Sequence, residues 1–198
     1  MKKWLEKVDW IYVIVPLALL GTFWVIAAFT GQWPWQSNPY NSYALQTDSW
    51  LKGRLDLGQD YPWLELAIYQ GKYFVSFPPF PSYVLIPFVM IFGTNTPDHL
   101  IALLVTIAGC VYAIKLYREV SLEKQHALFW VLMLYFASGY LFVGMNGYVW
   151  FIAQSMSFTL SLMALYYAMR QKGGLSLAFW ACAVGCRPML ALYGIDRK

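Results

Sequence analysis

The sequence predicts an all-α, polytopic integral membrane protein with about five transmembrane helices and an external loop that carries surface helices. Of its 198 residues, 60% are hydrophobic and only 12% are charged, and the mean hydropathy is +0.48. A chain of this composition has too little polar surface to cover a soluble globule, so lipid is expected to be its solvent. No soluble module or internal repeat interrupts the pattern, and we predict a single membrane domain over residues 1–198.

The first transmembrane helix is expected over residues 10–29, because residues 11–29 carry no charge. A helix of this length, rising about 1.5 Å per residue, crosses a hydrocarbon core of about 30 Å. Four later apolar stretches are expected to span as well, over residues 99–117, 126–145, 148–169 and 175–193. The opening MKKWLEK also resembles a signal peptide, but its apolar run is long and no small-x-small cleavage site follows. We therefore favour a retained first span.

A proline-rich apolar segment, residues 77–93, is expected to lie in the membrane surface, although its hydropathy would suit a span. Prolines at positions 78, 79, 81 and 87 leave an uninterrupted helical run of only about twelve residues, or about 18 Å. The external loop is therefore expected to extend over residues 30–98 and to contain a juxtamembrane helix near residues 80–92.

The placement of basic residues bears on this topology, because each extra crossing moves every later loop to the opposite side of the membrane. Eight basic residues flank the predicted spans: Lys2, Lys3, Lys7, Lys115, Arg118, Lys124, Arg170 and Lys172. All eight share one side only if residues 80–92 do not cross, and the positive-inside bias makes that side the cytoplasm. The sequence therefore predicts a multi-pass protein of the cell membrane with a cytoplasmic N-terminus.

The external loop holds five of the ten acidic residues and is the expected place for any chemistry. A helix is expected around residues 43–52, ended by Gly53, and turns and a short extended arm follow it. A carboxylate near the membrane surface can deprotonate an acceptor hydroxyl, while cations can stabilise a departing phosphate. The candidate bases are Asp48, Asp56, Asp60 and Glu65, and the candidate substrate-binding cations are Lys52, Arg54 and Lys72. The alternative is that these charges only solvate an exposed loop.

Arg187 differs from these residues because a guanidinium within an apolar run is costly. We predict that it binds an anionic group, such as a lipid phosphate, in the external half of the membrane. Snorkelling to the interface is the alternative. The loop tryptophans also have two interpretations, a headgroup belt or a platform for sugars; they are Trp33, Trp35, Trp50 and Trp63.

The cysteine and histidine residues indicate neither a disulfide framework nor a metal site. Cys110, Cys182 and Cys186 fall inside apolar spans, where they act as small hydrophobic residues. His99 and His126 stand at span ends without partners at metal-ligand spacing. No cofactor is therefore expected, and a divalent metal is not indicated.

Four segments together resemble a known family: NPYNSYALQTDSWLKGRLDL, LELAIYQGKYFVSFPPFPSYVLIPFVMIFG, KLYRE and VGCRP. In this order they look like the N-terminal part of bacterial GT-C glycosyltransferases, similar to the protein O-mannosyltransferases and aminoarabinose transferases. In that group a surface helix with a Pro-Pro motif, matched by Pro78 and Pro79, follows the catalytic loop. The resemblance implies sugar transfer from a polyprenyl-phosphate donor to an extracytoplasmic acceptor. The implied partners are membrane lipid and a polyprenyl-phosphate-linked sugar, with no nucleic acid.

The sequence departs from this family at a catalytic position. The family's acidic residue precedes a Tyr-Ala pair matched by Tyr43 and Ala44, whereas residues 38–41 here read NPYN and contain no carboxylate. Asp48 or Glu65 is then expected to act as the catalytic base, because each lies in a resembling segment with a lysine nearby in sequence. Otherwise the activity is altered or absent.

The chain has about five expected spans, fewer than GT-C enzymes typically carry, and its sequence ends in GIDRK. It is therefore expected to be incomplete at its C-terminus, as a truncated reading frame or half of a split enzyme, with a native small membrane protein as the alternative. The alternative function is a non-catalytic membrane subunit or transporter-like component of cell-envelope glycan assembly.

Overall fold

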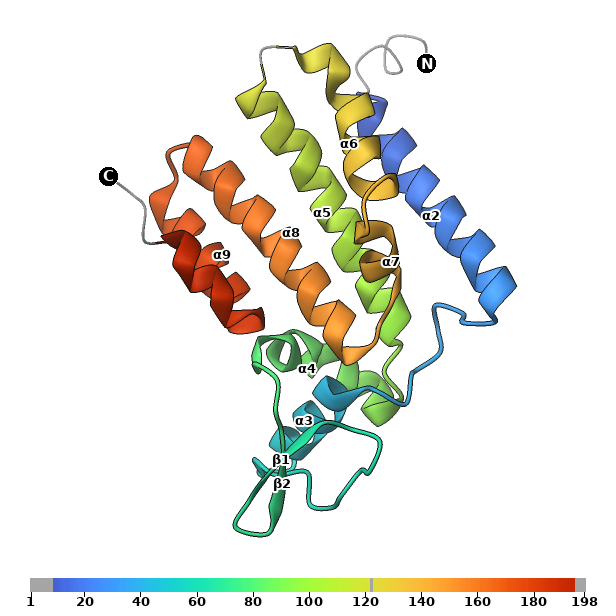
Figure 1. Cartoon of the computed structure of the whole chain (residues 1–198), viewed down its shortest axis with the longest axis vertical. Helices are drawn as coiled ribbons and strands as arrows, with labels where there is room; N and C mark the ends of the chain where they lie inside the picture. The colour runs from blue at the N-terminus through green and yellow to red at the C-terminus, as the bar shows by residue number, and fades with distance from the viewer. Residues whose placement is uncertain (1–8, 122, 195–198) are drawn as a thin grey trace.

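The computed structural model describes residues 9–121 and 123–194, and the fold is mostly helical, with 70% helix and 4% strand. Three long helices, α2 (Ile11–Thr30), α5 (Asp98–Val120) and α8 (Val149–Met169), form one bundle with α5 in the middle (Figure 1). Each is long and apolar enough to cross a membrane. They match the spans expected over residues 10–29, 99–117 and 148–169, and their insertion in a membrane stays a prediction.

One face of α2 packs against the bundle, and the other remains apolar and exposed. The packed face consists of residues at intervals of four, namely Ile11, Val15, Leu19, Phe23 and Ala27. This spacing keeps the side chains in one row along a helix. The outer face carries Leu17, Val25 and Phe29, and Phe29 is 88% exposed. Such a continuous apolar surface is what contact with lipid requires.

The basic residues that the topology assigns to the cytoplasm gather at one end of the bundle. Lys115 and Arg118 lie near the end of α5, and Arg170 and Lys172 directly follow α8. Both helix ends lie at the same end of the bundle as the start of α2, opposite the loop (Figure 1). Arg118 pairs with Asp9, and Arg170 pairs with Glu119 at 3.1 Å. Lys2, Lys3 and Lys7 lie outside the described residues.

The third expected span, over residues 126–145, is two short helices instead of one. The short segment η2 (Lys124–His126) leads into α6 (Ala127–Phe136). Three residues separate the end of α6 from the start of α7 (Tyr140–Met145). Ser138 lies between them, where its hydroxyl donates to the carbonyl of Leu134 at 2.5 Å and accepts from the Tyr140 amide at 3.1 Å. A serine that bonds neighbouring backbone in this way competes with the helical pattern.

The fifth expected span, over residues 175–193, is also interrupted. Helix α9 (Gly173–Cys186) has 14 residues, about 21 Å at the rise of an α-helix. Pro188 disfavours helical angles at the residue before it, and Arg187 is extended with φ −143° and ψ 100°. The segment η3 (Pro188–Gly194) then folds back on α9, where the Trp180 indole donates to the Leu190 carbonyl at 3.1 Å.

The loop folds into a small polar unit at the end of the bundle. Helix α3 (Ser42–Leu51) is followed by Gly53 with φ +72°, which confirms the predicted helix and its end. The antiparallel strands β1 (Leu66–Tyr69) and β2 (Lys72–Val75) form a hairpin. Helix α4 (Phe80–Phe92), followed by η1 (Gly93–Asn95), lies across the end of the bundle (Figure 1).

Helices α3 and α4 are joined by buried hydroxyl groups. The Thr47 hydroxyl donates to the Ser82 carbonyl at 2.8 Å, and the Ser82 hydroxyl donates to the Gln46 side chain at 2.6 Å. Because α4 runs across the bundle and not along α5 and α8, its orientation suits the membrane-surface helix expected near residues 80–92.

The two ends of the bundle should be accessible from opposite sides of the membrane. In a variant lacking Cys110, Cys182 and Cys186, we expect a cysteine at position 121 to react with an impermeant maleimide only from the cytoplasm. A cysteine at the exposed position 59 of the loop should react only from outside. Labelling of position 121 from outside would show that residues 80–92 cross.

Candidate functional site

A buried polar cluster fastens the start of the loop to the bundle. The Asn38 side-chain amide donates to Asp98 Oδ2 at 2.9 Å and to the Gly147 carbonyl at 3.0 Å. The Asn38 backbone amide lies 3.3 Å from the same carboxylate oxygen. Asp98 opens α5, where the helix dipole favours a carboxylate, and it is only 2% exposed. We refer to Asn38, Asp98 and Gly147 as the clasp.

The clasp requires glycine at position 147. A Cβ there would lie 2.5 Å from the Asp98 carbonyl carbon and 2.6 Å from the His99 amide nitrogen, both of them backbone atoms that cannot rotate away. The Gly147 amide donates to His99 Nδ1 at 3.2 Å. This turn therefore brings the starts of α5 and α8 into direct contact, and His99 has a structural partner.

Trp150, in the first turn of α8, joins two charged residues that are far apart in the sequence. Its indole Nε1 donates to Glu65 Oε2 at 3.3 Å, and its carbonyl accepts from Arg187 Nη2 at 2.6 Å. The Tyr40 ring packs against the indole with centroids 5.5 Å apart. Since Tyr40 lies two residues after Asn38, the clasp holds the loop beside Trp150, to which both Glu65 and Arg187 bond.

Two buried donors near Trp150 are Arg187 Nε and the Tyr43 hydroxyl. Neither has a hydrogen-bond partner among the described residues. Burial raises the pKa of Tyr43 above its ordinary value, although the nearby Arg187 guanidinium opposes the shift. Tyr43 therefore keeps its proton and can donate it. Buried donors are nearly always paired, so these two atoms indicate a place for an acceptor.

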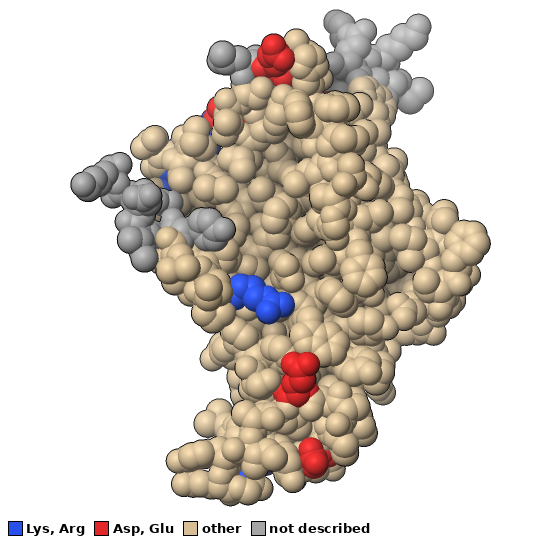
Figure 2. All heavy atoms as spheres, viewed as in Figure 1, with Lys and Arg blue, Asp and Glu red and all other residues tan. Residues whose placement is uncertain are grey.

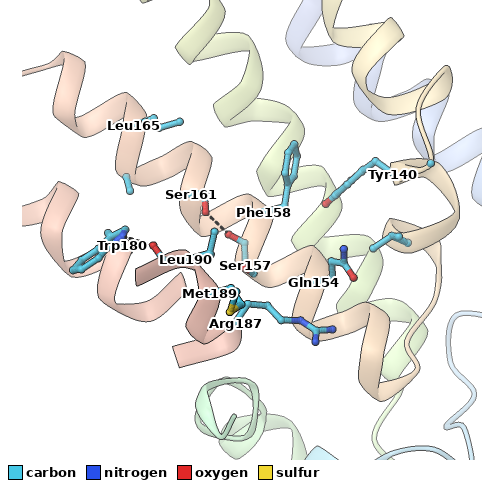
Figure 3. Close-up of a pocket in the computed structure, with 13 residues that line it drawn as sticks. Tyr140, Gln154, Ser157, Phe158, Ser161, Leu165, Trp180, Arg187, Met189 and Leu190 are labelled. Carbon is cyan, nitrogen blue, oxygen red and sulfur yellow. Dashed lines mark hydrogen bonds between the residues drawn. The ribbon is translucent and has the colours of Figure 1, made fainter. Parts of the chain in front are cut away.

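A cavity of about 900 Å³ lies between α7, α8, α9 and η3, and Arg187 forms part of its wall. The apolar lining includes Val143, Phe158, Leu165, Met189 and Leu190, and the polar lining includes Tyr140, Gln154, Ser157 and Ser161. Figure 3 shows Arg187 and Gln154 at the end nearest α4, with Leu165 toward the opposite end. The cavity is therefore charged at its loop end and apolar at the other.

The surface around this cavity is nearly uncharged. Figure 2 shows one basic side chain near the middle of this face, with acidic side chains only on the loop side of it and at the far edges. A cation in such surroundings acts over a longer distance than one among counter-charges, because the neighbouring surface screens it less.

The other predicted site residues lie elsewhere on the loop. Asp48 and Lys52 pair with each other at 2.6 Å along α3. Lys72 Nζ is 3.6 Å from Asp56 and sits opposite Tyr69 at the turn of the hairpin. Glu65 precedes the other end of β1, so about four residues at 3.3 Å each separate it from this turn. The structure thus joins Lys72 to Asp56 and not to Glu65.

Arg54 is exposed and covers Gly58 on the outside of the loop. A side chain at Gly58 would collide with its guanidinium, whose Nη1 is 2.1 Å from the Cβ position. Of the six predicted site residues, the structure therefore bonds Glu65 and Arg187 to the same residue, Trp150, pairs Asp48 with Lys52, and leaves Arg54 and Lys72 at separate places on the loop.

The loop tryptophans make contacts within the fold. Trp33 and Trp35 stack with centroids 5.2 Å apart, next to Trp24 of α2. Trp50 packs on Tyr83, and Trp63 donates to the Pro39 carbonyl at 3.0 Å. These contacts position the rings without deciding between headgroup belt and sugar platform, and both interpretations stay predictions.

Sequence reasoning missed Trp150, Asn38 and Asp98 as site residues. The expected loop over residues 30–98 ends at Asp98, and the expected span over residues 148–169 contains Trp150 with no predicted role. One local signal was present, since Asp98 immediately precedes an apolar run and could be read as the first residue of a helix. Trp150 had no such signal, because its partners are 85 and 37 residues away.

Within residues 9–121 and 123–194, no three His, Cys, Asp or Glu side chains are grouped so as to hold a metal ion. No protein-family model, curated protein or solved structure matches the chain. The class of protein therefore has to be argued from the site itself.

The clasp should contribute strongly to stability. Replacing Asn38 by alanine leaves the buried Asp98 carboxylate and Gly147 carbonyl without their donor, so we expect a loss of about 1–3 kcal/mol of unfolding free energy. Denaturant unfolding in micelles measures this loss. Asn95→Ala, at an exposed position, is the control and should change little. An equal, small effect of both substitutions would contradict the role of the clasp.

Proposed function

We propose that the chain binds a polyprenyl-phosphate-linked sugar and takes part in transferring the sugar to an acceptor on the outer face of the membrane. One observation carries the proposal: Arg187 lines the cavity and is joined through Trp150 to the Glu65 carboxylate. A cation and a carboxylate on either side of one residue provide the two groups that this reaction needs.

The cavity suits an amphiphile with an anionic head. Its apolar walls match an isoprenoid chain, and hydrophobic burial favours such a chain by about 25 cal/mol per Å². Arg187 Nε and the Tyr43 hydroxyl are buried donors without partners in the described part of the chain, and a phosphate oxygen would accept from both. The phosphate and the sugar of the lipid would then lie at the loop end of the cavity, beside Trp150.

Glu65 is the better placed of the two predicted bases. Asp48 already bonds Lys52 at 2.6 Å, whereas the exposed Glu65 carboxylate bonds, within the described residues, only the weakly donating indole of Trp150 at 3.3 Å. In the proposed reaction Glu65 accepts the proton of an acceptor hydroxyl as its oxygen attacks the anomeric carbon. The bond from that carbon to the phosphate oxygen breaks, and polyprenyl phosphate leaves with the electron pair, stabilised by Arg187.

The resemblance to GT-C glycosyltransferases agrees with this assignment in one respect. Tyr43, which matches the Tyr-Ala of the family's loop motif, lies near Arg187. The NPYN segment supplies no base, but Asn38 and Tyr40 hold the loop against Trp150. The membership of the chain in that family is part of the proposal.

Arg187 should determine phosphate binding. We expect Arg187→Gln to weaken binding of a fluorescent polyprenyl phosphate in detergent by about tenfold or more, the cost of a lost charge-assisted hydrogen bond. Arg187→Lys should also bind weakly, because lysine cannot reproduce the guanidinium fork. Arg170→Gln, at the other end of the bundle, is the control. Unchanged affinity in folded Arg187 variants would leave snorkelling as the explanation.

Glu65 should determine turnover without determining binding. We expect Glu65→Gln to slow sugar transfer by about 10²-fold or more, the usual contribution of a general base. The ratio of free to sugar-linked polyprenyl phosphate in membranes containing the protein reports the reaction. Asp48→Asn breaks only a surface pair and should keep most activity. Binding of the lipid without any turnover in the unmodified chain would favour the non-catalytic membrane subunit.

A further inference from the structure

A group of five hydroxyl side chains lies inside the bundle, where α5, α6, α7 and α8 meet. The residues are Thr106, Tyr135, Tyr140, Ser155 and Thr159. Tyr135 and Ser155 are fully buried, and Thr106 and Thr159 are 3% and 4% exposed. Their surroundings are apolar and include Cys110, Val131 and Phe158. We call this group the hydroxyl cluster.

Three members of the hydroxyl cluster have no hydrogen-bond partner among the described residues. The hydroxyls of Thr106 and Thr159 donate to the Gly144 and Val105 carbonyls at 2.8 and 3.1 Å. The hydroxyls of Tyr135, Tyr140 and Ser155 are buried and unpaired. The Tyr140 hydroxyl is close enough to those of Ser155, Thr106 and Thr159 to interact with them, but the geometry of a direct bond is not met.

Two glycines let the hydroxyls of the cluster approach the backbone closely. A Cβ at Gly109 would lie 2.5 Å from Thr159 Oγ1 and 2.9 Å from the Tyr135 hydroxyl. A Cβ at Gly144 would lie 2.7 Å from Thr106 Oγ1. A larger residue at either position would displace these hydroxyls, so the glycines preserve their arrangement.

We propose that the hydroxyl cluster binds ordered internal water. A buried water normally makes about three hydrogen bonds to polar groups that otherwise have no partner, and several converging hydroxyls supply them. Leaving three hydroxyls unpaired in apolar surroundings would cost several times the free energy of one lost hydrogen bond. Bridging water satisfies all of them without moving the helices.

The place of the cluster gives this water a role. It lies beside the break between α6 and α7, where backbone groups no longer have helical partners and need others if the segment is in a membrane. Tyr140, the first residue of α7, belongs both to the cluster and to the wall of the large cavity. Any movement of Tyr140 by a ligand in the cavity would therefore disturb the water. This inference does not depend on the proposed function.

The sign of a stability change tests the proposal. If water bridges the cluster, Tyr135→Phe removes a hydrogen bond and should lower the melting temperature in detergent by about 2–4 °C. If the Tyr135 hydroxyl is dry and unpaired, the same substitution should raise it. Tyr83→Phe, at an exposed ring, is the matched control and should change nothing.

Water itself can be detected by X-ray hydroxyl-radical labelling of the unmodified protein in ¹⁸O water. We expect Tyr135 to be labelled although it is fully buried, because the radicals form from adjacent bound water. Phe23, equally buried but among apolar residues, should stay unlabelled. The proposal is overturned if Tyr135 is labelled no more than Phe23, or if Tyr135→Phe raises or does not change the melting temperature.

Discussion

The buried bond between Asn38 and Asp98 sets the geometry on which the rest of the site depends. It closes a separation of 60 residues and ties the loop to the first turn of α5. Through Gly147 the same asparagine reaches the turn that starts α8. Tyr40 and Trp150 are carried into contact as a result, and Glu65 and Arg187 meet Trp150 from opposite sides. A carboxylate removed from water holds such a position only while its donors stay in place.

The cavity exists because two helices end early. Ser138 stops α6, and the extended backbone at Arg187 stops α9 before either helix reaches its expected length. The segments α7 and η3 that follow then form walls of the cavity. Local backbone chemistry, namely a serine that bonds the main chain and a proline that excludes helical angles before it, thus creates a binding space between helices that would otherwise pack closely.

The parts of the fold that follow from local sequence could be predicted. Long charge-free runs gave α2, α5 and α8, the prolines marked α4 as a short helix, and Gly53 marked the end of α3. The interruptions at Ser138 and Arg187 were not predicted, because hydropathy averages over single residues. The junction of Glu65 with Arg187 could not be predicted either, since it depends on a tryptophan between them. Proximity in the sequence suggested Lys72 as the cation beside Glu65, but the hairpin register places Lys72 opposite Tyr69 and 3.6 Å from Asp56.

The two ends of the bundle are held together by different kinds of bond. At the end where α2 begins, Arg170 and Glu119 form a pair whose side chains are 52% and 32% exposed. At the loop end, the Asn38 and Asp98 contact is buried. Mobile ions weaken the first kind of bond and hardly reach the second. Rising ionic strength should therefore weaken the Arg170 and Glu119 pair and leave the Asn38 and Asp98 contact intact, so the two ends of the bundle differ in their sensitivity to salt.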